Sequence, residues 1–278
     1  MKARWPGLAA GLLALALVSC AQGPLPTAHG SVPAGPPAPA DEQPGTPYWQ
    51  PDPGAGWQWQ LSGVLDLTVD AEIFDVDYET ATGTEVATLR QRGRRTICYL
   101  SAGSWEDFRS DAGDFPSSVR GDVMDGWPDE RWLDIRRTDI LLPLVAERMD
   151  ICAAKGFDAV EPDNLDGYLN DTGFPLSAQD QLTYNRAVAE LAHARGMSVA
   201  LKNDVAQIPE LVKDFDFAVN EECVRYDECA LYKPFTDAGK AVLHVEYEGE
   251  LDFCADSRRW GFSSLLKPLD LGAARTSC

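Results

Sequence analysis

The chain has 278 residues, a formal net charge of −20 and an isoelectric point near 4.4. A surface this acidic repels nucleic acid and anionic lipid, which excludes both as partners, and it would attract a cationic ligand. Acidity also serves solubility in many exported proteins, so the charge does not identify a ligand by itself.

Residues 1–20 have the pattern of a bacterial export signal. Lys2 and Arg4 give a positive start, and residues 8–18 form an apolar run too short to span a bilayer well. The run ends in LVSC, which resembles a lipobox and implies cleavage before Cys20 and lipidation of that cysteine. An ordinary secretory signal is the alternative. We predict a cell-surface or periplasmic lipoprotein, or a released form of it, that meets the membrane through its anchor alone.

Residues 21–50 are rich in Pro, Gly, Ala and Ser and have no apolar period. This composition predicts a flexible tether. Residues 51–278 then form one domain, long enough to bury a real core, which we expect to be monomeric.

Eight short apolar or β-branched runs alternate with helical patterns in this domain. The predicted strands are 57–61, 73–77, 96–101, 158–163, 198–203, 217–221, 241–247 and 263–266. The predicted helices are 84–91, 140–155, 178–195, 205–214, 230–238 and 252–259. Strand–helix alternation implies a parallel sheet, and eight repeats in this length favour a single α/β (β/α)8 TIM barrel over an open doubly wound sheet. The absence of GxGxxG and GxxxxGK[ST] agrees.

The longest insertion, residues 102–138, follows the third predicted strand and reads as a long Trp-rich loop. It contains Trp105, Trp127 and Trp132, with Phe108 and Phe115. Sugar rings stack on such side chains through their flat C–H faces. The alternative is that the aromatic residues pack the loop against the barrel. We expect at least one of them, with Trp127 as the candidate, to contact a ligand.

Polar residues gather where the predicted strands end. In a barrel these ends share one face, and active sites lie there. The pattern predicts these substrate-binding residues: Asp75, Asp77, Tyr99, Glu161, Asn164, Lys202, Asn220, Glu222 and Glu246.

Hydrolysis of a glycosidic bond needs two carboxyl groups, one on each side of the bond. The strongest candidates are in FDAVEPDNLDGY, residues 157–168, and FAVNEEC, residues 217–223. Each is an apolar strand that runs into acidic residues. A carboxylate at the end of a buried strand carries a desolvation cost, which function or pairing must offset.

These two segments, together with ICYLSAGSWEDFR, MDGWPDERWLDI, LKND and AGKAVLHVEY, resemble glycoside hydrolase family 114. That family contains endo-α-1,4-polygalactosaminidases. The match runs in consistent order from Trp57 to Tyr247. It implies a (β/α)8 barrel without cofactor or metal and an endo-acting hydrolase of α-1,4-linked galactosamine-containing polymer. It carries the catalytic pair onto Asp163 and onto a glutamate of Asn-Glu-Glu, for which we choose Glu221.

The roles follow from a further similarity. Several barrel families that act on α-glycosides place a nucleophilic aspartate after strand four and an acid/base after strand six. We therefore predict Asp163 as nucleophile and Glu221 as general acid/base in a retaining mechanism, although a one-residue shift of register would exchange Glu221 with Glu222. Glu161 shares the strand parity of Asp163 and could bind substrate or tune a pKa. Lys202 could hold Asp163 ionised or form an ordinary barrel ion pair.

The expected substrate agrees with the charge. Unacetylated galactosamine carries an ammonium group near neutral pH, so a mouth lined by acids would favour a cationic amino-sugar polysaccharide. The acids expected there are Asp75, Asp77, Glu161, Asp204 and Glu246, whereas Asp166 resembles a loop or cap acid.

Six cysteines remain besides Cys20, and an even number in an exported protein suggests disulfides. Short loops favour Cys223 with Cys229 and Cys254 with Cys278, which leaves Cys98 with Cys152. A zinc site competes weakly, because no CxxC occurs and His29, His193 and His244 are scattered.

Two other functions stay open. One is a non-catalytic polysaccharide-binding lipoprotein on the same barrel, against which the presence of both carboxylates argues. The other is a metal-dependent deacetylase, which needs a His/Asp cluster that the sequence lacks. The sugar could also be α-linked N-acetylgalactosamine, galactose or a mixture, because one hydroxyl or acetyl contact decides it.

Overall fold

The computed structural model describes residues 48–278. Cys20, the predicted signal and most of the predicted tether lie outside the described residues. None of the helices in residues 48–278 combines the length and the apolar character that a membrane span needs.

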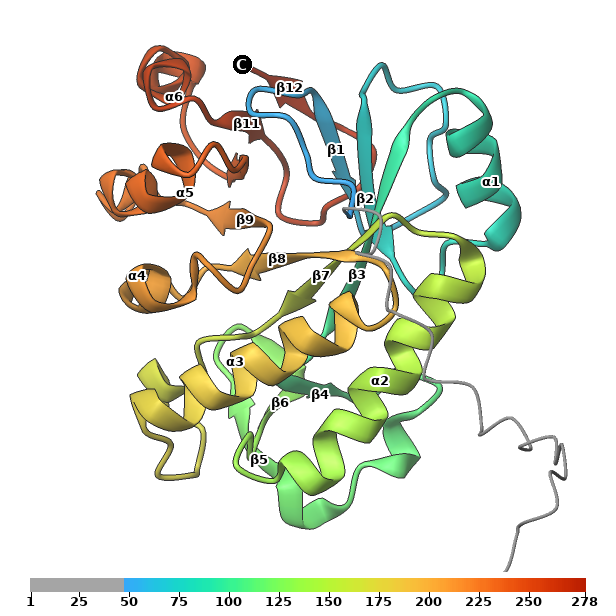
Figure 1. Ribbon diagram of the computed structural model, residues 1–278, viewed down its shortest axis with the longest axis vertical. Coiled ribbons are helices and arrows are strands. Elements are labelled where there is room, and N and C mark those ends of the chain that lie inside the picture. The colour runs from blue at the N-terminus through green and yellow to red at the C-terminus, as the bar shows by residue number, and fades with distance from the viewer. Residues whose placement is uncertain (1–47) are drawn as a thin grey trace, which may run out of the picture. The chain divides into compact units, whose positions relative to one another are not determined.

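The core of the fold is a curled sheet of nine strands in the order β1-β2-β3-β7-β8-β9-β10-β11-β12 (Figure 1). Neighbouring strands from β1 to β11 are parallel, and β12 pairs antiparallel with β11. All eight predicted strands are present in the predicted order: β1 Trp57–Gln60, β2 Ile73–Asp77, β3 Arg95–Ser101, β7 Ala159–Asp163, β8 Ser198–Lys202, β9 Phe217–Glu221, β10 Val242–Glu246 and β11 Ser263–Leu266, followed by β12 Thr276–Ser277.

The sheet differs from a closed eight-stranded barrel between its first and last strands. No ladder among the described strands joins β11 to β1, because the short β12 pairs with β11 at that edge. The seam is bridged in other ways. The Trp57 indole donates to the Ser263 carbonyl at 2.9 Å, Arg275 donates to the Trp57 carbonyl at 2.8 Å, and the Leu61 amide donates to the Leu271 carbonyl at 3.0 Å. The C-terminal segment therefore completes the wall that a direct β1–β11 ladder was expected to form.

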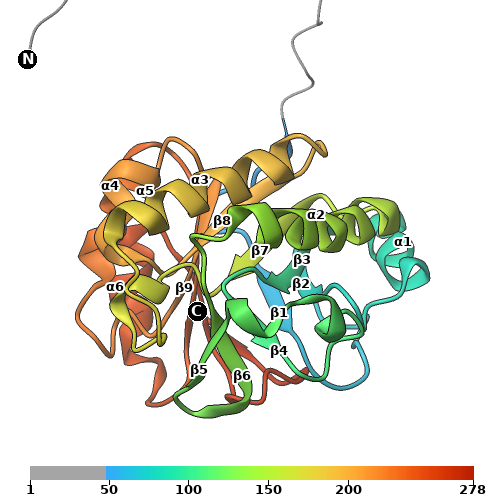
Figure 2. The same ribbon diagram turned by 90° about the horizontal axis from the view of Figure 1, so that it is seen from below.

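Helices lie outside the curled sheet (Figures 1 and 2). They are α1 Gly83–Gln91, α2 Thr138–Lys155, α3 Ala178–His193, α4 Ile208–Leu211, α5 Lys233–Asp237 and α6 Cys254–Trp260. Helix α3 begins as predicted, with Ser177 and Asp180 in a reciprocal capping box. The helices α4 and α5 are shorter than predicted. Pro209 and Pro234 start them after a 3-10 turn, since proline fits the first helical turn but has no N–H for the turn before it.

Side chains alternate between two apolar layers along each strand. Phe74 and Val76 of β2 pack in the layer between sheet and helices, whereas Ile73 packs inside the curled sheet with residues such as Trp59 and Leu243. The same alternation turns the last inward-facing residue of several strands toward the open end of the sheet. The acidic strand ends are therefore brought to one place by the strand period.

The insertion is a small antiparallel sheet in the order β4-β6-β5, not the loop that we expected. Its strands are β4 Ser104–Glu106, β5 Arg120–Met124 and β6 Trp127–Leu133, with 3-10 turns at Ala112–Asp114 and Ser117–Val119. Ion pairs fasten it to β2 and to α2. Arg109 contacts Asp77 of β2 at 2.6 Å, and Arg148 of α2 contacts Asp111 at 2.7 Å, while Arg109 also pairs with Glu106 inside the insertion at 2.8 Å.

The aromatic residues of the insertion divide between packing and exposure. Trp132 and Phe115 are buried, and Trp105 is partly buried under the Arg120 guanidinium, 4.4 Å from the ring centroid. Trp127 is 49% exposed. Packing thus accounts for most of the group and leaves Trp127 available to a ligand.

The three disulfides are those that loop length suggested. Cys98–Cys152 joins β3 to α2, Cys223–Cys229 closes the turn after β9, and Cys254–Cys278 ties the C-terminus to α6. The sulfurs of Cys223 and Cys229 lie near His244, but their disulfide removes both as metal ligands.

Gly103 allows β3 and β7 to meet closely where both end. The amides of Ala102 and Gly103 both donate to the Asp163 carbonyl, at 3.0 and 3.1 Å. A Cβ at Gly103 would lie 1.7 Å from the carbonyl oxygen of Asn164. No side chain fits there without moving the backbone next to Asp163.

We expect Gly103→Ala to lower the free energy of unfolding by about 1–3 kcal/mol, because the methyl group must displace backbone. Denaturant unfolding measures this change. Gly113→Ala is the matched control, since nothing lies within 4 Å of its Cβ position, and its effect should stay within about 0.5 kcal/mol. Equal losses in the two variants would contradict the close approach.

Candidate active site

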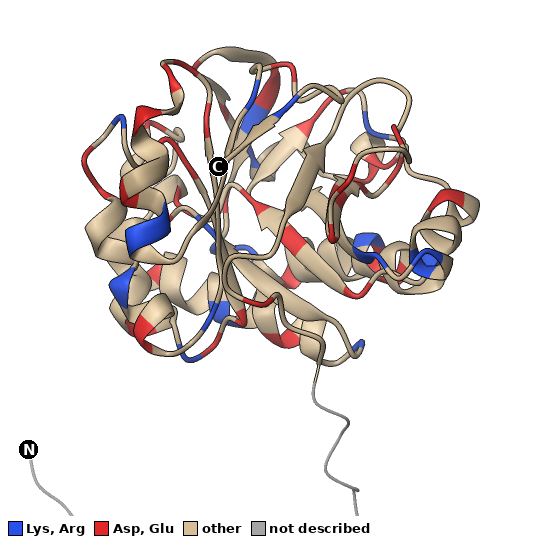
Figure 3. Cartoon of the chain, turned by 90° about the horizontal axis from the view of Figure 1, so that it is seen from above, with Lys and Arg blue, Asp and Glu red and all other residues tan. Residues whose placement is uncertain are grey.

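The carboxyl ends of the parallel strands open into a cavity of about 1050 Å³. The chain has 44 acidic and 24 basic residues. Acidic positions are also the more frequent in the described part of the chain (Figure 3), and the imbalance is stronger in this cavity. The lining includes two basic residues, Arg109 and Lys202, and ten acidic ones: Asp77, Glu79, Glu106, Asp125, Glu130, Asp163, Asp166, Asp171, Glu221 and Asp270. Active sites of parallel barrels lie on this face.

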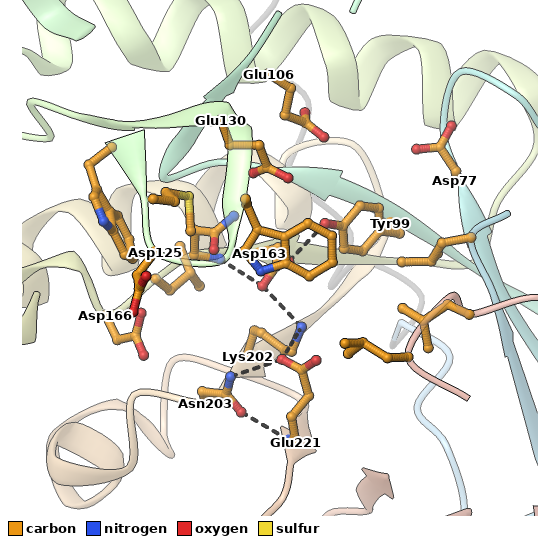
Figure 4. Close-up of a pocket in the computed structure, with 18 of the residues that line it drawn as sticks. Asp77, Tyr99, Glu106, Asp125, Glu130, Asp163, Asp166, Lys202, Asn203 and Glu221 are labelled. Carbon is orange, nitrogen blue, oxygen red and sulfur yellow. Dashed lines mark hydrogen bonds and ion pairs between the residues drawn. The ribbon is translucent and has the colours of Figure 1, made fainter. Parts of the chain in front are cut away.

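Asp163 is the last residue of β7 and is held by three donors (Figure 4). Tyr99 Oη donates to Oδ2 at 2.8 Å, while Lys202 Nζ and the Asn164 amide donate to Oδ1 at 3.0 and 2.8 Å. Burial alone would raise the pKa of Asp163, but the Lys202 charge and these hydrogen bonds hold it below its ordinary value. The carboxylate is therefore ionised at neutral pH.

Glu221 is the last residue of β9 and is fixed mainly by Asn203 and Tyr247. Tyr247 Oη donates to Oε1, and Asn203 Nδ2 donates to Oε2 at 3.2 Å. The Asn203 side-chain oxygen also accepts the backbone N–H of Glu221 at 3.0 Å. Asn203 thus holds both the backbone and the carboxylate of this residue.

Lys202 ends β8, the strand between β7 and β9, and its ammonium lies between the two carboxylates (Figure 4). Its Nζ is 3.0 Å from Asp163 Oδ1 and 3.0 Å from Glu221 Oε2, so these two oxygens are at most 6.0 Å apart. Glu161 Oε1 is 3.3 Å away, and the Trp59 ring centroid is 4.7 Å away. Although burial lowers the pKa of Lys202, the surrounding carboxylates raise it well above the ordinary value and keep the side chain charged.

Left-handed residues follow the last residue of these three strands. They are Asn164 at φ 62°, Asn203 at φ 48° and Glu222 at φ 60°. This conformation costs about 1–3 kcal/mol for a residue with a Cβ and is best tolerated by asparagine. Each of these residues ends its strand directly after the functional side chain.

The turn at Glu222 decides which glutamate faces the cavity. Glu221 lines it, whereas Glu222 does not, and Glu222 pairs with Arg225 at 2.6 Å. The strand register therefore agrees with the choice of Glu221.

The other predicted substrate-binding residues fall into two groups. Asp77, Tyr99, Trp127, Asn164 and Lys202 line the cavity. Asp75, Glu161, Asn220, Glu222 and Glu246 do not, and neither does Asp204.

The second group corrects the prediction. Glu222 pairs with Arg225 at 2.6 Å, and Asp204 accepts a hydrogen bond from Asn185 at 2.9 Å. Asp75 and Glu161 are fully buried below the site. Asn220 accepts from the Cys223 amide at 3.1 Å, and Glu246 accepts from the Val224 amide at 2.8 Å, so both hold the turn after β9. The strand-end pattern predicts the side of the sheet but not the depth of a residue.

Several cavity residues were missed by sequence reasoning. Glu130 of β6 accepts a hydrogen bond from Ser104 at 2.8 Å, and burial raises its pKa to about 7. Asp166, expected as a loop or cap acid, lines the cavity, and burial raises its pKa to about 6. Trp127 to Leu133 reads WPDERWL, without the polar–apolar alternation of a half-buried strand, so no local signal pointed to the strand that carries Glu130 into the site.

Replacement of Lys202 by Met tests its role as the shared counter-charge. We expect Lys202→Met to lower the free energy of unfolding at pH 7 by about 3–5 kcal/mol, since it leaves buried carboxylates uncompensated. Because the pKa of Asp163 is lowered in the folded state, its ionisation stabilises the wild type at pH values above the pKa of an unfolded aspartate, and this contribution is lost as pH falls through the folded-state pKa. The difference in unfolding free energy between the wild type and Lys202→Met should therefore narrow between about pH 5 and pH 2. Denaturant unfolding across pH measures it, with Lys213→Met, at an exposed lysine, as control. A gap independent of pH would contradict this role.

Comparison with known proteins agrees with this geometry. Residues 38–278 match the model of glycoside-hydrolase family GH114. The structure of Ega3 from Aspergillus fumigatus in complex with galactosamine is similar, with a TM-score of 0.77, 37% sequence identity, and coverage of 84% of this chain and 99% of that chain.

The glycoside hydrolase domain of PelA from Pseudomonas aeruginosa has a TM-score of 0.64 at 13% identity, covering 82% of this chain and 99% of that chain, which shows the fold alone. No curated protein sequence matches the chain. On the family match and the likeness to Ega3, the chain belongs to glycoside-hydrolase family GH114 and is a glycosidase.

Proposed function

We propose that this glycosidase cuts α-1,4-linked galactosamine-containing polysaccharide at internal bonds by a retaining mechanism. The main support for a retaining mechanism is the position of the Lys202 ammonium. Its 3.0 Å contacts to Asp163 Oδ1 and Glu221 Oε2 mean that these two oxygens are at most 6.0 Å apart. Retaining glycosidases hold the two carboxyl groups about 5–5.5 Å apart, whereas inverting enzymes need roughly 6.5–9.5 Å for a water molecule. The short spacing supports retention.

The reaction assigns a different role to each carboxyl group. Asp163, ionised by its donors, attacks the anomeric carbon while protonated Glu221 gives its proton to the leaving oxygen. A covalent glycosyl ester forms on Asp163, and Glu221 becomes the carboxylate. Glu221 then takes a proton from water, which attacks the same carbon and releases Asp163. The negative charge thus moves from one side of Lys202 to the other and back.

The cavity suits a cationic chain of sugars. Its ten carboxyl side chains would attract the ammonium groups of unacetylated galactosamine, the sugar that Ega3 binds in its complex. Phe108, Trp127 and Tyr226 line the cavity, are 60%, 49% and 58% exposed, and offer faces for sugar rings. At about 1050 Å³ the cavity slightly exceeds the range of about 300–1,000 Å³ for small-molecule sites, which leaves room for more than one sugar.

The three disulfides support export of the protein, because disulfides persist in oxidising compartments outside the cytoplasm. We extend the proposal to a monomeric lipoprotein anchored through Cys20, with residues 21–50 as the tether. Its active domain would then work outside the cytoplasm.

Polymer cleavage tests the activity and the pair together. The protein without residues 1–20 should convert partly deacetylated α-1,4-galactosamine polymer into a ladder of oligosaccharides, read by mass spectrometry. Asp163→Asn should abolish the ladder, and Glu221→Gln should slow it by about 10²–10⁴-fold. Both should still bind polymer.

Glu222→Gln is the matched control, because the neighbouring carboxylate lies outside the cavity, and it should cut nearly as fast as the wild type. An active Asp163→Asn variant would refute the assignment. A wild-type protein that binds the polymer and cuts none would favour a binding role instead.

A further inference from the structure

Two buried carboxyl groups below the site take no part in the reaction described above. Asp75 of β2 and Glu161 of β7 are both 0% exposed. Each lies two residues before a cavity residue, Asp77 or Asp163, on the same side of its strand. No other group among the described residues donates a hydrogen bond to their four carboxylate oxygens. Acidic groups so deeply buried need an explanation.

Charge balance excludes full ionisation of this group. Even with Glu221 protonated as the general acid, Asp75, Glu161 and Asp163 would share the single ammonium of Lys202, and each uncompensated buried charge costs several kcal/mol. A further proton between Asp75 and Glu161, whose side chains are within hydrogen-bond reach of each other, removes a charge and supplies the missing donor. Neighbouring carboxyl groups in other enzymes share a proton for the same reason.

The position of Lys202 decides which group carries the proton. Glu161 Oε1 is 3.3 Å from the ammonium, whereas Asp75 forms no ion pair within the described residues. Glu161 is therefore the ionised member. Burial also raises the pKa of Glu161, although the Lys202 charge opposes this shift. Burial and the neighbouring Glu161 charge raise the pKa of Asp75 well above its ordinary value, so the contact with Lys202 decides in favour of a neutral Asp75.

We propose that Asp75 carries a proton shared with Glu161, and that ionised Glu161 is a positioning residue that holds the Lys202 ammonium midway between Asp163 and Glu221. The role of Glu161 in the reaction rests on the proposed function. Without a fixed anion below it, the ammonium would follow whichever carboxylate is charged at each step. With Glu161 in place it stays near both, above the Trp59 ring.

The titratable groups around this centre come from several elements. Tyr99 and Tyr247 stay neutral because burial raises the pKa of both phenols. The β1 and β11 strands contain no titratable residue. The remaining groups that face the centre are Glu130, Asp163, Asp166 and Glu221.

The pH dependence of kcat/KM on the polymer tests the proposal. Its acid limb reports Asp163, which must be ionised. Glu161→Gln removes a negative charge near Asp163, so this limb should move to lower pH by about one unit. We expect kcat to fall while KM changes little, and Glu161→Asp, which keeps the charge, to restore the acid limb.

Asp75→Asn is the matched comparison, because an amide replaces a carboxyl group that is already neutral and can still donate to Glu161. Its acid limb should coincide with that of the wild type. An unmoved acid limb in Glu161→Gln, or an equal shift in Asp75→Asn, would overturn the proposal. If Glu161→Gln does not fold, the shared proton can still be tested, because the next measurement uses only the wild type and Asp75→Asn.

Infrared spectroscopy tests the shared proton without any substrate. The difference between wild type and Asp75→Asn at neutral pH should contain the carbonyl band of one protonated carboxyl group. Absence of that band would overturn the proposal even in an active enzyme. Its presence in a protein that cuts no galactosamine polymer would uphold the pair while the proposed function fails.

Discussion

The ammonium of Lys202 is the interaction on which the rest of the site depends. It is buried and contacts three carboxylates, from Glu161 and Asp163 on one neighbouring strand and Glu221 on the other. Such a charge is stable in the interior because its partners compensate it, and they are stable there because of it. The same contacts set the distance between the two carboxylates at the cavity, so the electrostatics of the fold also fix the geometry of the proposed chemistry.

A few local features of the backbone produce this arrangement. Strand alternation directs Asp163, Lys202 and Glu221 inward at the ends of adjacent parallel strands. A left-handed residue then ends each strand, and one of these residues, Asn203, also holds Glu221 through hydrogen bonds to its backbone and its carboxylate. The close approach of Gly103 to the backbone after Asp163 secures the first of these strand ends. Backbone strain is thus concentrated beside the residues that would react.

The choice of Asp163 and Glu221 among the acidic residues came from the family resemblance, whereas sequence reasoning predicted the strands because period and polarity are local signals. It placed Asp75 and Glu161 at the mouth because parity indicates which side a residue faces but not how deep it lies. Glu130 was missed, since its role depends on the insertion folding as a sheet. The seam between β1 and β11 was also beyond prediction, because the two residues of β12 give no detectable pattern. Long-range contacts explain each difference.

The anomeric configuration of the first product tests the central claim most directly. Two carboxylates bridged by one ammonium should act by double displacement, so cleavage of the α-linked polymer should release the α-anomer first. Proton NMR during the first minutes of the reaction, before mutarotation, distinguishes the two anomers. Initial accumulation of the α-anomer is the predicted result. Initial accumulation of the β-anomer would mean direct attack by water and would contradict the account.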